Sequence, residues 1–174
     1  MKVYFVTHAT SKDNEDKTAS GWKDVELSEL GIQQAKERGE TFKNIKLDMI
    51  YCSDLKRAVD TVQIAFRQKY PVFVDRRLRE LNYGDFNGKP RDIVESMKQQ
   101  RITDCFPNGE SYEQGVARIR DFCQELKAAH PEKVILIVGH SVTQFGLDVF
   151  AGRRTIAECL SKPLKWQPYW EYDL

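Results

Sequence analysis

The chain has 174 residues, of which 41% are hydrophobic and 30% are charged, and this composition is typical of a soluble globular protein with a single domain over 1–174. Its 27 Lys and Arg residues nearly balance its 26 Asp and Glu residues, and the net charge of +1 provides no general attraction for nucleic acid or an anionic membrane. The N-terminal apolar run resembles a strand rather than a signal peptide, and four scattered cysteines indicate a reduced, cytoplasmic protein.

Hydrophobic periodicity predicts an alternation of strands and helices. In chain order the predicted elements are a strand at 2–6, a polar loop at 10–28, a helix at 30–42 that Ser28 caps, a strand at 49–52, a helix that Ser53 or Asp54 caps and that runs to about Arg67, a strand at 72–74, a helix that Pro90 opens, a helix at 110–129, a strand at 133–138, a helix at 142–150 and an edge strand at 166–172.

This alternation predicts the α/β class, with three layers: a mostly parallel central sheet and helices on both of its faces. Residues 133–138 are apolar on both faces and are expected to form a central strand. Open parallel sheets bind ligands beyond the carboxyl ends of their strands. Because His8, Ser53 and His140 each follow a predicted strand directly, we expect them to converge.

The two histidines at strand ends are the first candidates for chemistry. Either one alone could be a hydrogen-bonded residue of the core. Their shared position in the topology favours a functional pair instead. The third histidine, His130, is followed by Pro131 at a predicted helix end and is expected to be a solvated terminal residue.

Arg57 and Glu80 are the charged candidates. Arg57 lies in the first turn of a predicted helix, where its guanidinium can bind two oxygens of a phosphate; the alternative is an ordinary surface arginine. Glu80 lies between apolar residues, and a carboxyl group in such surroundings can act as a general acid. The alternative for Glu80 is an ion pair with Arg77 or Arg79.

These candidates lie in segments that resemble the histidine phosphatase superfamily, also called phosphoglycerate-mutase-like. The similar segments run in order over nearly the whole chain: VTHATSKDN, SGWKDVELSELGIQQA, IYCSDLKRAVDT, RLRELNYGDFNG, PNGESYEQGVARI and VILIVGHSVT. The third segment closely resembles the Ser-x-Leu-x-Arg-Ala-x-x-Thr block of the family, with Ser53, Leu55, Arg57, Ala58 and Thr61 in place.

The resemblance implies a phosphoglycerate-mutase-like fold and hydrolysis of a small phosphorylated substrate without a metal ion or cofactor. The residues implied to bind the phosphate are His8, Arg57, His140, Asn14 and Ser141. The residues implied to be catalytic are His8, which would become a phosphohistidine, His140, and Glu80, which would protonate the leaving alcohol and later activate water. Positive side chains would neutralise charge as Mg²⁺ does in kinases.

The first motif departs from the family's Arg-His-Gly pattern. Thr7 stands in place of the arginine and Ala9 in place of the glycine. Thr7 offers a hydroxyl but no charge, and the loss of one donor to a transition state costs about 100- to 1,000-fold in rate. The departure predicts a slow phosphatase, a phosphatase that uses another cation, or a phosphate-ester-binding or regulatory module without turnover. The candidates for another cation are Lys12, Arg79 and Arg91.

The sequence suggests two alternatives to hydrolysis through His8, an α/β-hydrolase and a mutase. The segment GHSVT resembles the nucleophile elbow of α/β-hydrolases, with Ser141 as nucleophile, but that motif needs glycine where Thr143 stands and a histidine further along the chain. The mutases of the family carry longer insertions, whereas residues 81–108 leave room for a small cap at most. A more open pocket admits water, which favours a phosphatase over a mutase.

Substrate specificity is expected to come from small cap elements at about 10–28 and 83–112. The aromatic residues that could line this surface, or that could equally be ordinary packing residues, are Trp22, Tyr83, Phe86 and Phe106.

Overall fold

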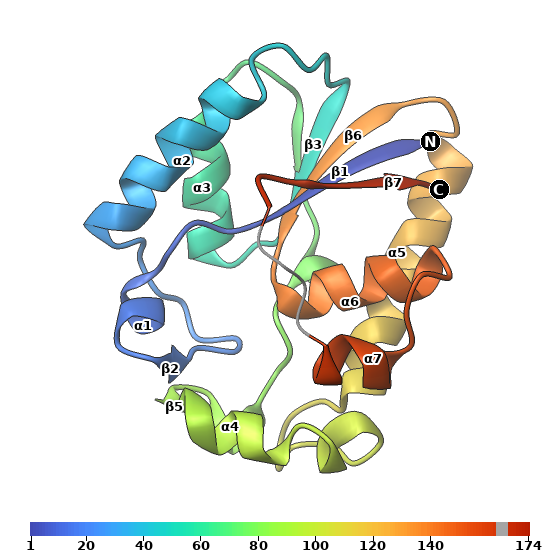
Figure 1. Cartoon of the computed structure of the whole chain (residues 1–174). Coiled ribbons are helices and arrows are strands. Elements are labelled where there is room, and N and C mark those ends of the chain that lie inside the picture. The colour runs from blue at the N-terminus through green and yellow to red at the C-terminus, as the bar shows by residue number, and fades with distance from the viewer. Residues whose placement is uncertain (163–166) are drawn as a thin grey trace.

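The computed structural model describes residues 1–162 and 167–174, with a five-stranded sheet at its centre (Figure 1). Across the sheet the strands are β4 (Val72–Val74), β3 (Met49–Cys52), β6 (Val134–Gly139), β1 (Lys2–Thr7) and β7 (Trp170–Asp173). The first four are parallel to one another, and β7 pairs antiparallel with β1 at one edge. The structure therefore confirms a mostly parallel sheet with β6 as a central strand.

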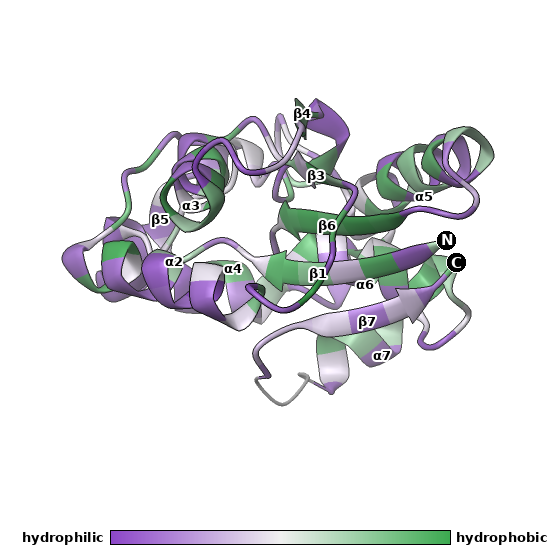
Figure 2. Cartoon of the chain, turned by 90° about the horizontal axis from the view of Figure 1, so that it is seen from above, coloured by the Kyte–Doolittle hydropathy of each residue, from purple (hydrophilic) through white to green (hydrophobic). Residues whose placement is uncertain are grey.

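Helices cover both faces of the sheet and make three layers (Figure 1). On one face lie α2 (Glu29–Thr41) and α3 (Lys56–Phe66), and on the other lie α5 (Tyr112–Ala129), α6 (Ser141–Phe150) and α7 (Ile156–Ser161). Successive strand residues point to opposite faces, so that Phe5 packs in one hydrophobic cluster and Val6 in the other. Since β6 is buried on both faces, it is hydrophobic over nearly its whole length (Figure 2).

The pairing of β1 with β6 brings the two strand-end histidines together. Their register runs from Lys2 opposite Val134 to Thr7 opposite Gly139. The next backbone N–H, that of His8, donates to the Gly139 carbonyl at 2.9 Å. His8 and His140 therefore leave the sheet at the same edge, as the positions of their strands predict.

Several short elements lie beyond this edge, at the bottom of Figure 1. Between β1 and α2 they are α1 (Lys12–Glu15) and β2 (Thr18–Ala19). Between β4 and α5 they are β5 (Lys89–Pro90) and α4 (Arg91–Met97), with short 3₁₀ turns η1 (Arg76–Leu78), η2 (Gly84–Phe86) and η3 (Gln100–Ile102) in the same connection. The two short strands β2 and β5 pair antiparallel, with Thr18 opposite Pro90. This pairing ties the loop that follows β1 to the segment that carries α4.

Several element boundaries differ from the sequence-based expectations. Residues 10–28 are not a continuous loop, because Ser11 caps α1 and forms a reciprocal capping box with Asn14. A helix of four residues is too short to show hydrophobic periodicity. The expected cap of α3 was also wrong: Leu55 holds that position without a side-chain hydrogen bond, and Asp54 instead binds Arg79.

The second half of the chain shows similar shifts. α5 begins at Tyr112 behind the cap Ser111, and Pro90 is the N-cap of α4 rather than its first helical residue. The short helix α7 was not predicted. The final strand begins at Trp170, and residue 166 of the predicted strand lies outside the described part of the chain. No helix in the described part is long and apolar enough to cross a membrane.

Candidate active site

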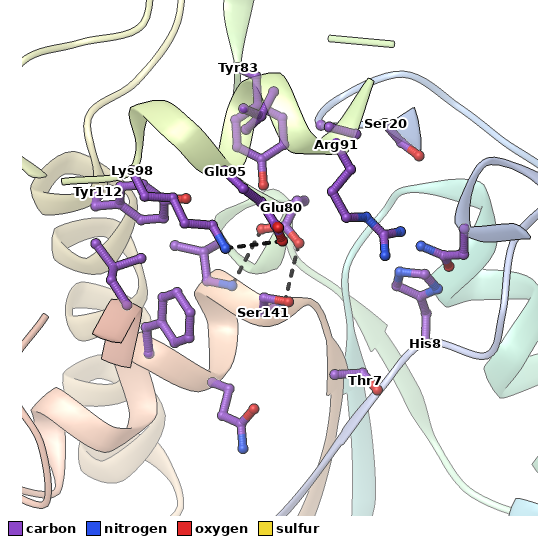
Figure 3. A pocket seen from close by; sticks show the side chains of 18 of the residues that line it. Thr7, His8, Ser20, Glu80, Tyr83, Arg91, Glu95, Lys98, Tyr112 and Ser141 are labelled. Atoms are coloured by element: carbon purple, nitrogen blue, oxygen red, sulfur yellow. Dashed lines mark hydrogen bonds and ion pairs between the residues drawn. The ribbon is translucent and has the colours of Figure 1, made fainter. Parts of the chain in front are cut away.

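His8 lies at the carboxyl end of β1, with its imidazole fixed by the backbone carbonyl of the next residue. Its Nδ1 is 2.6 Å from the Ala9 carbonyl oxygen. Since a carbonyl only accepts, Nδ1 carries the proton and donates, and this leaves Nε2 with a lone pair that accepts a hydrogen bond from Arg57 Nε. The ring borders the pocket drawn in Figure 3. The substitution at Ala9 is compatible with this turn, because Ala9 is not among the residues with positive φ.

The imidazole of His8 is held in the neutral form. Burial, followed by the nearby positive charge of Arg57, lowers the pKa of His8 to about 3. A protonated histidine has no lone pair with which to attack phosphorus, so a depressed pKa keeps the nucleophilic form present at neutral pH.

Arg57 projects from the first turn of α3 and is 2% exposed. The alternative interpretation of Arg57 as an ordinary surface arginine is therefore wrong. Its two Nη atoms donate to the carbonyls of Gly21 at 2.9 Å and Lys23 at 3.0 Å, and its Nε lies 3.3 Å from His8 Nε2. Burial lowers the pKa of Arg57, while Glu80 opposes that effect. The guanidinium is thus a fixed positive group against the nucleophilic nitrogen of His8.

His140 is the N-cap residue of α6 and faces His8 across the site. The two ring centroids are 5.0 Å apart, and His140 is 1% exposed. Neither of its ring nitrogens hydrogen-bonds to another described residue, which is unusual for buried polar atoms. Burial and then Arg57 and His8 hold the pKa of His140 well below its usual range. Two unsatisfied ring nitrogens beside a cation suit an oxyanion ligand.

Glu80 faces the same pocket from the segment between η1 and η2, and its expected apolar surroundings were wrong. Its carboxylate accepts the backbone N–H groups of Leu81 at 2.8 Å, Ser141 at 3.2 Å and Val142 at 3.3 Å. The ion-pair alternatives were wrong as well, because Arg77 pairs with Asp75 and Glu125, and Arg79 with Asp54. The first N–H groups of a helix have no partner within it, and α6 directs two of them to Glu80.

The backbone of Glu80 is held by a charged pair that the sequence analysis did not single out. Arg118 of α5 donates to the carbonyls of Arg77, Arg79 and Glu80, and its Nε lies 2.9 Å from Oε1 of Glu110. Glu110 in turn accepts the N–H of Asn82. Glu110 and Arg118 both lie in the segment PNGESYEQGVARI, and its resemblance to the family was the signal that could have singled them out.

The pocket beside His8 has a volume of about 630 Å³. Asn14 lines it, and because its Oδ1 accepts the Ser11 N–H at 3.0 Å, its amide NH₂ remains to meet a ligand. Ser141 and Thr7 also line the pocket. Of the four aromatic residues considered for specificity, Tyr83 is a lining residue, Trp22 donates to the Glu80 carbonyl, and Phe106 packs in the core with Phe86 against it.

Part of the pocket wall was not predicted from the sequence. Besides residues from 10–28 and 83–112, the wall includes side chains of α6, α7 and β7: Gln144, Phe145, Cys159, Leu160 and Trp170. α7 was not predicted, and the helix predicted at 142–150 was given no place in the pocket wall.

A half-buried, neutral histidine, an arginine, a second histidine and a carboxylate around one pocket are the parts of a phosphoryl-transfer site. The family model for the histidine phosphatase superfamily (branch 1) matches residues 3–144. The chain belongs to this superfamily and is a phosphatase or phosphoglycerate-mutase-like enzyme.

Individual relatives support the same assignment. A putative phosphoserine phosphatase 2 of Hydrogenobacter thermophilus is 32% identical over 151 residues, which cover 82% of this chain and 74% of the relative. The uncharacterized phosphatase PhoE of Bacillus subtilis is 31% identical over 139 residues, covering 79% of this chain and 70% of PhoE. The solved structure of Bacillus stearothermophilus YhfR superimposes with a TM-score of 0.85 at 26% identity, covering 98% of this chain and 89% of YhfR.

The fold stability is expected to fall as the pH is lowered from about 6.5 to 5. In this window the unfolded chain protonates His8 and His140, whereas both stay neutral in the folded protein because their pKa values are depressed. Each such histidine removes up to about 1.4 kcal/mol of stability per pH unit. Urea unfolding at pH 7 and pH 5 measures the loss. His140→Asn should lessen this pH dependence, and an unchanged dependence would contradict the assignment.

Proposed function

We propose that this chain hydrolyses small phosphomonoesters through a phosphohistidine at His8. The observation that carries the proposal is the state of His8: Nδ1 donates to the Ala9 carbonyl, and Nε2 lies 3.3 Å from Arg57 Nε at the pocket. A neutral imidazole with one fixed tautomer and a cation beside its lone pair is prepared for attack on a phosphoryl group.

In the first step Nε2 of His8 forms a bond to phosphorus while the bond from phosphorus to the leaving oxygen breaks. The leaving alcohol takes a proton from Glu80, which enters the step as a carboxylic acid with a proton that arrives with the substrate monoanion. Arg57 gives up its hydrogen bond to His8 and donates to the phosphoryl oxygens, together with His140 and Asn14.

In the second step water attacks the phosphohistidine. Glu80, now a carboxylate, takes a proton from the water, and the electron pair of the breaking P–N bond returns to His8 Nε2. Glu80 then gives this proton to the departing phosphate, and the products are inorganic phosphate and free enzyme. Since Glu80 lies at the N-terminus of α6, backbone N–H groups stabilise its ionised form between the steps.

Hydrolysis is favoured over mutase activity because the stretch between Glu80 and Gly109, residues 81–108, leaves room for a small cap at most. We infer that segments 10–28 and 83–112 act as small caps on a single domain and that water reaches the site.

The four unpaired cysteines, three of them buried, support a reducing, cytoplasmic setting.

The proposal is tested by trapping the intermediate. The protein is mixed with p-nitrophenyl phosphate, denatured in alkali, in which phosphohistidine survives, and its peptides are analysed by mass spectrometry. We expect phosphate release and a phosphoryl group on the His8 peptide. Phosphate release with the phosphoryl group on another residue, or no phosphate release with any phosphomonoester, would overturn the proposal. Conversion of a phosphoglycerate to its isomer without phosphate release would favour the mutase.

A further inference from the structure

The site has one positive charge fewer beside its nucleophile than the family motif provides. Thr7 borders the pocket with a neutral hydroxyl, where the family motif places an arginine. The nearby Arg38 does not supply the missing charge, because it donates to the Thr7 carbonyl and does not line the pocket. A transferring phosphoryl group carries charge on three equatorial oxygens. Among the described side chains, Arg57 alone hydrogen-bonds to His8 Nε2.

Two cations that the sequence offered as replacements are committed elsewhere. Lys12 pairs with Glu26 at 2.6 Å on the exposed surface. Arg79 binds both carboxylate oxygens of Asp54, at 2.7 and 2.6 Å, and stacks on the ring of Trp22. Neither residue lines the pocket. Lys98 does line it but pairs with Glu95 at 3.3 Å.

Arg91 lies at the pocket and, within the described part of the chain, is also free of an ion pair, a combination that Lys12, Arg79 and Lys98 do not have. It lines the pocket, and it forms no ion pair with any described carboxylate. Figure 3 shows its side chain extending from the opposite wall toward His8, with the guanidinium group leading. An unpaired guanidinium directed at a nucleophile is suited to an anion between the two.

The backbone at Arg91 is held by hydrogen bonds, and these fix the position from which its side chain extends. Its N–H donates to the Lys17 carbonyl at 2.8 Å. The preceding Pro90 pairs with Thr18 between β5 and β2. These contacts link the start of α4 to the same loop that carries Asn14 and the carbonyl of Gly21, to which Arg57 donates.

We propose that Arg91 supplies the second guanidinium for the transferring phosphoryl group, from the cap of the pocket, in place of the arginine absent at Thr7. This inference rests on the proposed function at His8. It makes the cap part of the phosphate site itself, and it predicts that turnover is retained despite the variant motif.

The test measures p-nitrophenyl phosphate hydrolysis and the affinity for inorganic phosphate by calorimetry, for wild type, Arg91→Gln, Arg91→Lys and Thr7→Arg/Arg91→Gln. We expect Arg91→Gln to lose about 100- to 1,000-fold in kcat/KM and at least about 10-fold in phosphate affinity. Arg91→Lys should lose less, and Thr7→Arg should restore most of the loss. The matched control Lys89→Gln, an exposed charge two residues away that does not line the pocket, should behave like wild type.

The outcomes separate this inference from the proposed function. Wild-type turnover that depends on His8 but is unaffected by Arg91→Gln would overturn the role of Arg91 and leave the proposed function standing. Absence of turnover in wild type would overturn the proposed function, and phosphate affinity would then decide on Arg91. A loss confined to substrates with a second anionic group, absent with p-nitrophenyl phosphate, would assign Arg91 to the leaving group and overturn the inference.

Discussion

Replacing His8 with asparagine is expected to reduce phosphomonoester hydrolysis by at least about 1,000-fold, because the variant has no nucleophile to divide the transfer into two steps. The side-chain amide of asparagine can still donate to the Ala9 carbonyl, which now binds Nδ1 of His8. Folding should therefore be preserved while the lone pair at Nε2 is lost. Steady-state kinetics and the loss of alkali-stable phosphoprotein measure the effect.

The matched control is His130→Asn. His130 is the C-cap of α5, and its Nε2 lies 3.4 Å from the hydroxyl of Tyr51, outside the pocket. This variant removes a half-buried histidine that does not line the pocket, and it should keep the wild-type rate. Equal rates for His8→Asn and wild type would contradict catalysis through His8, whatever the control shows.

The second large effect is expected for Arg118→Met, which should lower the free energy of unfolding by about 3–5 kcal/mol. The substitution leaves Glu110 without its partner and frees the carbonyls of three residues, including Glu80. Both side chains of the pair are mostly buried, at 16% and 17% exposure, so that solvent cannot replace the lost bonds fully. Urea unfolding monitored by circular dichroism gives the loss.

Arg120→Met is the control on the same helix. Arg120 is exposed, and surface substitutions of this kind usually change stability by less than about 0.5 kcal/mol. We also expect Arg118→Met to reduce turnover in the fraction that stays folded, because Glu80 loses the support of its backbone. A loss of stability below about 1 kcal/mol would show that the Glu110–Arg118 pair does not hold this segment.

The sequence alone determined the sheet and the meeting of its two histidines. Strands β1, β3, β4 and β6 were visible as β-branched or aromatic runs, and their alternation with helices requires parallel pairing. Residues that directly follow parallel strands of one sheet share one edge, and the structure adds that β1 and β6 are neighbours in it. That geometry places His8 and His140 within 5.0 Å of each other between ring centroids, and it needs no knowledge of the loops.

Tertiary structure alone decided the polar surroundings of that pair. Glu80 meets the N–H groups of α6 about sixty residues later in the chain, and Arg118 reaches back to the same segment from α5. Such contacts depend on how separate segments pack, and they leave no period or spacing in the sequence. The sequence also does not show which cation replaces the arginine absent at Thr7, because nothing in it distinguishes Lys12, Arg79 and Arg91. Ion pairing commits the first two, whereas the β2–β5 pairing anchors the chain beside Arg91, whose guanidinium extends toward His8 (Figure 3).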